Sequence, residues 1–179
     1  TRFEKEIKMR FIKSLSAALL IASPAVAFDG DDQTRLEQAL DAYATSLKTA
    51  DYKAVVDALP PGVIALLSEQ AKLSPETIRA SVTAQMATIM QSATIESFDM
   101  NVETMTSGTT GAGTNYAFLP TTTRIAVGDA PIQQASTLTL AVEDDATWHL
   151  MRIELDQHYF IFRAAYPDFA DVPLPEIAE

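Results

Sequence analysis

The chain has 179 residues, no cysteine, and 24 acidic against 13 basic side chains, which gives a net charge of −11 at pH 7. Without cysteine, the chain can form no disulfide or thiolate metal site, and it cannot be acylated as a lipoprotein. The negative charge argues against binding to nucleic acid or to an anionic membrane surface, and no basic patch opposes this.

The N-terminal 27 residues have the layout of a secretory signal peptide. Residues 9–27 begin with basic side chains, continue with an apolar run at 15–22, and end in small residues before Ala27. The apolar run is about half as long as a membrane-spanning helix needs to be. We therefore expect cleavage after Ala27 and a periplasmic or secreted location. Residues 1–8 are predicted to be an upstream extension without a structural role.

The mature chain is expected to form one domain. Removal of five basic and two acidic residues with the leader leaves eight basic and 22 acidic side chains, a net charge of −14. A chain of about 150 residues can bury a single core without cross-links. We expect a single α+β domain over residues 28–172, a loose acidic tail over 173–179, and no membrane association after cleavage.

The first half of this domain is predicted to be helical. Apolar residues recur at three- and four-residue steps from 32 to 48, which is typical of an amphipathic helix. Asp51 can cap a short second helix, residues 60–62 end it, and residues 63–70 allow another turn or two. Ser74 and the proline after it predict the start of a longer helix. The apolar stripe of that helix is formed by Ile78, Val82, Met86, Ile89 and Met90.

The second half changes to the alternation of β-strands. Residues 94–105 are predicted to form a strand that is closed by turn residues at 107–113. A second strand follows over 115–127. Pro120 interrupts it, and because proline cannot donate to a sheet ladder, an edge position or a bulge is expected there.

A hairpin is predicted near the end of the sheet. After a turn at 128–131, two strands over 134–142 and 147–155 are joined by the acidic segment 143–146. Residues 158–169 are apolar and form either a last strand or a helix docked on the sheet. Helices followed by an antiparallel meander predict an α+β fold.

Two short motifs suggest a family. The first motif is an aromatic residue, an aliphatic residue four positions later, and a small residue followed by Asp; here these are Tyr43, Leu47 and Ala50-Asp51. The second motif is a charged turn followed by Trp, here Asp144-Asp145 and Trp148. Together with the element order over residues 32–165, they resemble the nuclear-transport-factor-2-like superfamily, which includes ketosteroid isomerases and SnoaL-like polyketide cyclases. The resemblance implies a cone-shaped fold with N-terminal helices packed on a curved antiparallel sheet. The family's usual strand pair between the second and third helices is not evident.

The resemblance also bears on activity. The isomerases of the family use a tyrosine on the first helix and two carboxylates, and Tyr43 falls where that tyrosine would be. The first carboxylate is missing from residues 60–68, and the second position aligns near Leu138. Isomerase activity is therefore not expected, because only the tyrosine of the three catalytic groups has a counterpart in this sequence.

The parity of the strand predicts the face of the sheet to which His149 points. If the hairpin loop has an even number of residues, Leu140 pairs with His149, and His149 points to the apolar face opposite Trp148. A three-residue loop with a bulge would reverse this. Asp144 and Asp145 are predicted to lie in the turn and away from His149. A core histidine is more common than a catalytic one in such a position.

We interpret the chain as a small exported binding or accessory protein of no identified chemistry, with an apolar pocket for a small apolar ligand between helices and sheet. Two alternatives stay open: a lyase or isomerase that uses His149 and Tyr43 in the pocket, and a structural homodimer formed through the sheet face that carries Trp148. No cofactor and no metal site are predicted. The residues predicted to line the pocket are Tyr43, Leu47, Met86, Met90, Leu138, Leu140, His149 and Met151.

Overall fold

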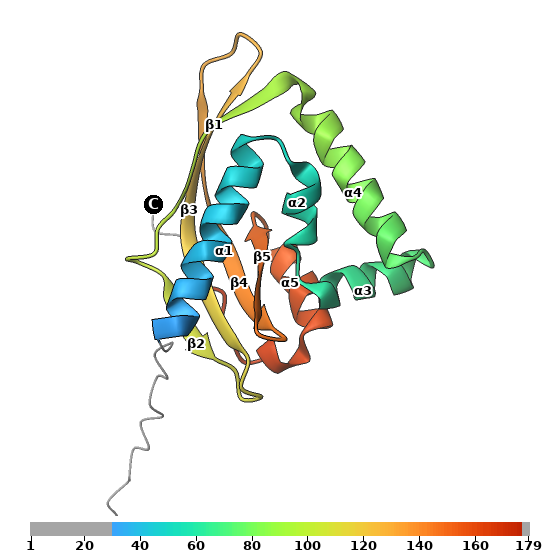
Figure 1. Ribbon diagram of the computed structural model, residues 1–179, viewed down its shortest axis with the longest axis vertical. Helices are drawn as coiled ribbons and strands as arrows, with labels where there is room; N and C mark the ends of the chain where they lie inside the picture. The colour runs from blue at the N-terminus through green and yellow to red at the C-terminus, as the bar shows by residue number, and fades with distance from the viewer. Residues whose placement is uncertain (1–29, 177–179) are drawn as a thin grey trace, which may run out of the picture.

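The computed structural model describes residues 30–176, so the predicted signal peptide lies outside the described residues. Helices come first in the chain and an antiparallel sheet follows (Figure 1). The helices are α1 (Gly30–Lys48), α2 (Tyr52–Asp57), α3 (Pro61–Ala71) and α4 (Pro75–Ile89), followed by a 3-10 turn, η1 (Met90–Ser92). The later elements are β1 (Ala93–Met100), β2 (Thr106–Thr109), β3 (Asn115–Val127), β4 (Gln133–Asp144), β5 (Thr147–Ile153), α5 (Asp156–Ala165) and η2 (Pro167–Phe169).

The predicted α+β class is confirmed. Helices pack on a curved antiparallel sheet, which is the arrangement that the resemblance to the nuclear-transport-factor-2-like superfamily implies. The expected departure from that family is also present, because α3 and α4 occupy the segment in which members of the family have a strand pair. Residues 158–169, for which strand and helix were both open, form α5 and η2.

Local signals explain where the helices begin. The Asp51 carboxylate accepts a hydrogen bond from Ala54 N at 3.0 Å, and the Ser74 hydroxyl accepts one from Thr77 N at 3.2 Å. These bonds satisfy donors that the first turn of a helix leaves without a partner. The helix α3 is longer than expected because Pro61 occupies its first position, where a proline costs no hydrogen bond.

The strand β3 lies in the middle of the sheet, whose order is β1-β3-β4-β5, with β2 also paired to β3. The expectation of an edge position or a bulge at Pro120 is therefore wrong in both forms, because β3 has partner strands on both sides and keeps its register with β4 through Pro120. Pro120 lies between the stretch of β3 that pairs with β2, which ends at Phe118, and the stretch that pairs with β1, which begins at Thr121. Its carbonyl accepts from Asn101 N on that side at 2.8 Å. Because the N–H and C=O of a strand residue point the same way, the missing donor falls in this gap between two partner strands.

Both faces of the sheet are covered, and residues of β3, β4 and β5 that point to opposite faces enter separate clusters. On one side, the α1 face, Leu36 and Tyr43 of α1 pack against Leu119, Trp148 and Leu150 of the sheet. The opposite side is the α5 face. Its buried residues are Val63, Phe118, Leu138, Leu140, Val142, Ile153, Tyr159, Phe162 and Phe169.

This coverage argues against the homodimer that the sequence analysis placed on the sheet face of Trp148. Trp148 is 5% exposed and lies beneath α1, so the sheet face that carries it is not available to a second subunit. At the C-terminal end, Leu174 packs against the α5-face cluster, and the Tyr159 hydroxyl donates to the Val172 carbonyl at 2.7 Å. The described part of the predicted tail therefore contacts the core.

The helix α4 runs along the outer side of the molecule (Figure 1) and buries little of its surface. Of its predicted apolar stripe, Ile78 alone is buried, whereas Ile89 is 66% exposed. The main contacts of α4 are with α2 and α3. Its apolar stripe therefore contributes less to the core than its periodicity predicts.

The β4–β5 hairpin is tighter than expected. Val142 pairs with His149, and Asp144 pairs with Thr147, which leaves a loop of Asp145 and Ala146. Both loop residues have positive φ, 48° and 58°, as a type I′ turn requires. The predicted partner of His149 is therefore wrong by two residues, because the strands continue further toward the turn. Its predicted facing is right, because a shift of two residues preserves the side of the sheet.

Candidate functional site

The residues predicted to line one pocket are divided between the two sides of the sheet. Tyr43, Leu47 and Met86 belong to the cluster of the α1 face. Leu138, Leu140 and Met151 belong to the cluster of the α5 face. Met90 lies in η1 and is half-buried, as is His149 in β5. The structure therefore does not bring these eight residues together around one cavity.

The space between α1 and the sheet is occupied by side chains. The rings of Tyr43 and Phe98 lie 5.9 Å apart between centroids, and both residues are buried. Burial raises the pKa of the Tyr43 hydroxyl to about 12. Tyr43 is thus a neutral core residue, and its environment resists the deprotonation that a general base would need.

Tyr43 and His149 lie on opposite faces of the sheet. Tyr43 packs with Trp148 and Leu150, whereas His149 points to the side of Val142 and Met151. The lyase or isomerase alternative required both side chains in one cavity, so the structure rules out this pair. The physical reason is parity, because adjacent residues of a strand point to opposite faces.

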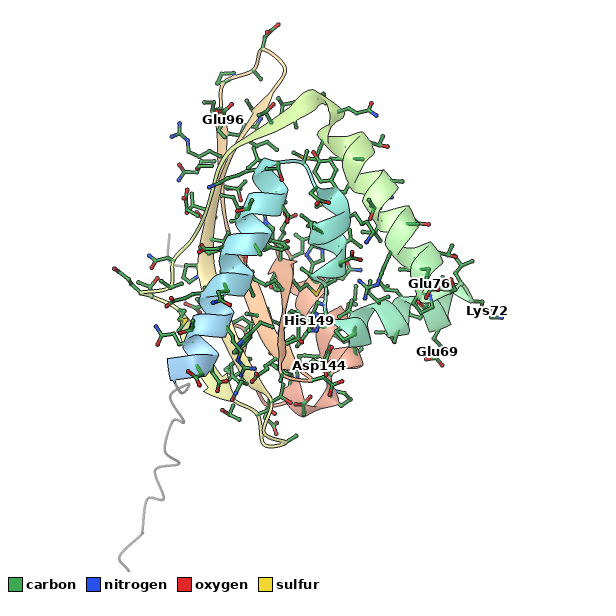
Figure 2. All side chains as sticks on the ribbon, viewed as in Figure 1. Glu69, Lys72, Glu76, Glu96, Asp144 and His149 are labelled. Carbon is green, nitrogen blue, oxygen red and sulfur yellow. The ribbon has the colours of Figure 1, made fainter. Side chains whose placement is uncertain are left out.

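Asp144 is closer to His149 than the sequence predicted. It belongs to β4 rather than to the turn, and it lies on the same side of the sheet as His149. Both residues are labelled in Figure 2. Burial is the largest effect on His149 and lowers its pKa below the usual 6.5, and the negative charge of Asp144 opposes this shift in part.

Tyr166 connects Asp144 to the start of α3. Its hydroxyl donates to Asp144 Oδ2 at 3.0 Å and accepts from Gly62 N at 3.0 Å. A Cβ on Gly62 would lie 2.9 Å from the Tyr166 ring, so only glycine permits this approach. The carbonyls of Ala58 and Leu59 face His149 beside this cluster.

The cluster of His149, Asp144, Tyr166 and Gly62 has a structural role. The Nδ1 atom of His149 is buried and has no hydrogen-bond partner among the described residues, whereas the Tyr166 hydroxyl is bonded both to Asp144 and to the backbone N–H of Gly62. These contacts hold the α2–α3 corner to the hairpin. Within residues 30–176, no group of three or more His, Asp or Glu side chains is arranged to hold a metal ion.

A groove of about 910 Å³ runs beside α5, on the α5 face of the sheet. Two large apolar side chains stand open to solvent in it, Phe160 at 74% and Leu155 at 61% exposure. Its floor is apolar as well, with Leu138 and Ile153 contributed by the sheet. We call it the α5 groove. It is lined by Leu138, Ile153, Glu154, Leu155, Asp156, Tyr159, Phe160, Arg163, Leu174, Pro175 and Glu176.

The charges of the α5 groove are mainly negative. Glu154, Asp156 and Glu176 are exposed at its rim, and Glu154 is paired with Arg152 at 3.2 Å. Among the described residues, Arg163 is the one cation that lines the groove. It is already engaged, because it donates to the Ala170 carbonyl and its guanidinium carbon lies 5.9 Å from the centre of the Tyr159 ring. The groove therefore favours an apolar occupant without negative charge.

Sequence reasoning found one residue of the α5 groove, Leu138. A usable signal was present in the last apolar segment. When residues 156–165 are placed on a helix, Tyr159 and Phe162 share one side and Phe160 falls on another. A large aromatic residue on the outer side of a docked helix indicates a binding surface when other exposed apolar residues lie beside it.

No family model matches the sequence, and a search of the curated proteins finds no match either. Among solved structures, the chain is similar to Aln2 from a Streptomyces species, with 13% sequence identity and a TM-score of 0.49. The match covers 76% of this chain and 98% of Aln2. A similarity this low gives no information about the ligand or the activity of this chain. Among the described residues, no helix has the length and apolarity needed to cross a membrane.

Proposed function

We propose that the mature chain is a small exported binding or accessory protein whose binding site is the α5 groove. Its ligand is apolar and either neutral or positively charged. The observation that carries the proposal is the exposure of Phe160 and Leu155 inside a concave surface of about 910 Å³. Side chains of this kind are normally buried, and their joint exposure in a groove is typical of a binding surface.

The burial of Phe160 and Leu155 by a ligand would contribute favourably to the free energy of binding. Covering a fully exposed Phe or Leu contributes about 1.5–3 kcal/mol, so two partly exposed side chains supply a useful fraction of a micromolar affinity. The rim carboxylates of Glu154, Asp156 and Glu176 disfavour an anionic ligand. They also disfavour an anionic membrane as the surface that Phe160 contacts.

A pair of dyes tests the proposal. A neutral naphthylamine dye and its sulfonated, anionic analogue both fluoresce when they leave water, and they differ mainly in charge. We expect the neutral dye to bind the mature protein with the higher affinity. Phe160→Ser should weaken its binding about fivefold or more, because the main apolar contact is lost.

The matched control is Ile89→Ser. Ile89 is 66% exposed on α4, far from the groove in sequence, and its substitution should leave dye affinity unchanged. Equal affinities of the two variants would contradict the α5 groove as the binding site. Tighter binding of the sulfonated dye would contradict the proposed charge preference.

A further inference from the structure

The strand β4 has an unpaired edge next to the α5 groove. Its N-terminal part, Gln133–Thr137, precedes the first residue that pairs with β5, which is Leu138. On the other side, this part pairs with β3 as far as Gln133. The backbone groups of Gln133–Thr137 that point away from β3 therefore have no strand partner among residues 30–176. The β3–β4 hairpin extends beyond β5 in Figure 1.

The free edge and the groove meet at one point. The last pair of the β4–β5 ladder is Leu138 with Ile153, and both residues line the α5 groove. After Ile153 the chain leaves the sheet through Glu154 and Leu155 and enters α5. If β5 continued beyond Ile153, it would pair with this free edge of β4. The space that it would fill is open, and at Leu138 and Ile153 this space meets the apolar groove.

This edge has few of the features that usually prevent pairing; the one charged side chain bonded to it among the described residues is Arg152, which donates from Nε to Thr137 Oγ1 at 3.2 Å. Gln133, Gln134, Ala135 and Ser136 are exposed and carry no charge, in a mature chain whose net charge is −14. The opposite edge strand, β1, has a register shift between Ile95 and Ser97, and it carries Glu96 and Asp99 on exposed positions. Charges and bulges of this kind blunt a sheet edge, whereas a flat, uncharged edge accepts a further strand.

We propose that an extended segment of a partner polypeptide, neutral or positively charged, adds to β4 along Gln133–Thr137 and places its apolar side chains in the α5 groove. This inference rests on the proposed function, because it names the class of ligand for the same groove. Backbone hydrogen bonds would supply affinity for any extended sequence, and the groove would select apolar side chains at alternate positions. The rim carboxylates of Glu154 and Glu176 select against acidic segments.

The proposed mode can be separated from simple filling of the groove by peptide chemistry. The probe is a short fluorescent peptide in which valine alternates with lysine and threonine. Two derivatives are N-methylated at alternate residues, one at the odd and one at the even positions. In an extended strand, alternate N–H groups point to the same edge, so each derivative blocks one edge and leaves the side chains unchanged.

We expect the parent peptide to bind and to displace the neutral dye. One N-methylated derivative should bind about tenfold more weakly or worse, and the other should keep its affinity. Hydrogen exchange should slow at the amides of Gln133–Thr137 when the parent peptide binds. Replacing its lysines with glutamates should weaken binding, and Phe160→Ser should weaken binding of both peptide and dye.

The failures are distinguishable. If the dye binds in the groove and the parent peptide does not, the inference is wrong and the proposed function stands. Equal affinity of the two N-methylated derivatives would also overturn it, because the groove would then recognise side chains without strand pairing. If neither dye nor peptide binds, the proposed function fails and the inference fails with it.

Discussion

The guanidinium carbon of Arg152 lies 5.9 Å from the centre of the Phe98 ring, although Arg152 belongs to β5 and Phe98 to β1, at opposite ends of the sheet order. Two strands, β3 and β4, separate them. Such an approach is possible because the sheet curves around the α1 face and brings its two edges toward each other. Phe98 also contacts Tyr43 of α1, so one ring joins both edges of the sheet to the helix.

Phe98→Ala should destabilise the protein strongly. Phe98 is 2% exposed, and its removal leaves a cavity between α1 and the sheet, for which we expect a loss of about 3–5 kcal/mol in the free energy of unfolding. Urea denaturation of the mature protein measures the change. Phe160→Ala is the matched control, because that ring is exposed in the groove and its loss should cost less than about 0.5 kcal/mol. Similar losses in the two variants would refute the central role of Phe98.

His149 should make stability depend on pH. Burial lowers the pKa of His149 below 6.5, so between that lowered pKa and 6.5 the unfolded chain binds more protons than the folded one. The free energy of unfolding should therefore fall as pH drops through this range. Asp144 and the carbonyls of Ala58 and Leu59 limit the effect, and Arg79 adds to it.

The measurement compares urea denaturation at about pH 7 and about pH 5.5, where histidines titrate more than carboxylates do. His149→Gln should lose less stability over this range than the unmodified protein does. His158→Gln, on α5, is the control and should behave like the unmodified protein. A pH dependence that is unchanged in His149→Gln would show that His149 does not cause it.

Ala146→Gly should stabilise the β4–β5 hairpin. Ala146 has a φ of 58°, a left-handed conformation that costs a residue with a Cβ about 1 kcal/mol and costs glycine little. The Ala146 carbonyl, which accepts from Arg35 Nη1 at 2.9 Å, is retained in the variant. Thermal unfolding should show a higher Tm. Ala130→Gly, in the β3–β4 loop at ordinary φ, should show no such rise, and a rise in both would contradict the turn argument.

Export should remove residues 1–27. When the chain is expressed from Met9 in a bacterium with a general secretion pathway, the intact mass of the exported product should correspond to a chain that begins at Phe28. Ala27→Lys should block cleavage, because the processing site requires a small residue there. A product in the cytoplasm that retains the leader would contradict export.

Features that depend on a few neighbouring residues could be predicted from the sequence. Asp51 and Ser74 mark helix starts because each side chain bonds within its own first turn. The facing of His149 could be predicted because it depends only on the hairpin loop having an even number of residues, and loops of two and of four residues give the same facing. The fold class followed from the change of periodicity between the two halves of the chain.

The remaining features depend on how the elements meet in space. Parity shows that Leu138 and His149 share a face, but it does not show that α1 covers one face and α5 the other. The end of β4 at Asp144 depends on a two-residue turn in which Ala146, an unusual residue for that conformation, has positive φ. The α5 groove exists because β5 leaves the sheet at Ile153, and no local pattern indicates that departure.

The outer edge of β5 is closed by the N-terminal half of the chain, because Leu150 N donates to the Ala58 carbonyl at 2.8 Å. Trp148 and Leu150, on the same strand, cover the apolar side of α1. These two residues are synthesised long after α1. A chain that ends before Thr147 would lack them and would leave part of the apolar side of α1 uncovered, which would make it a target for proteases and chaperones.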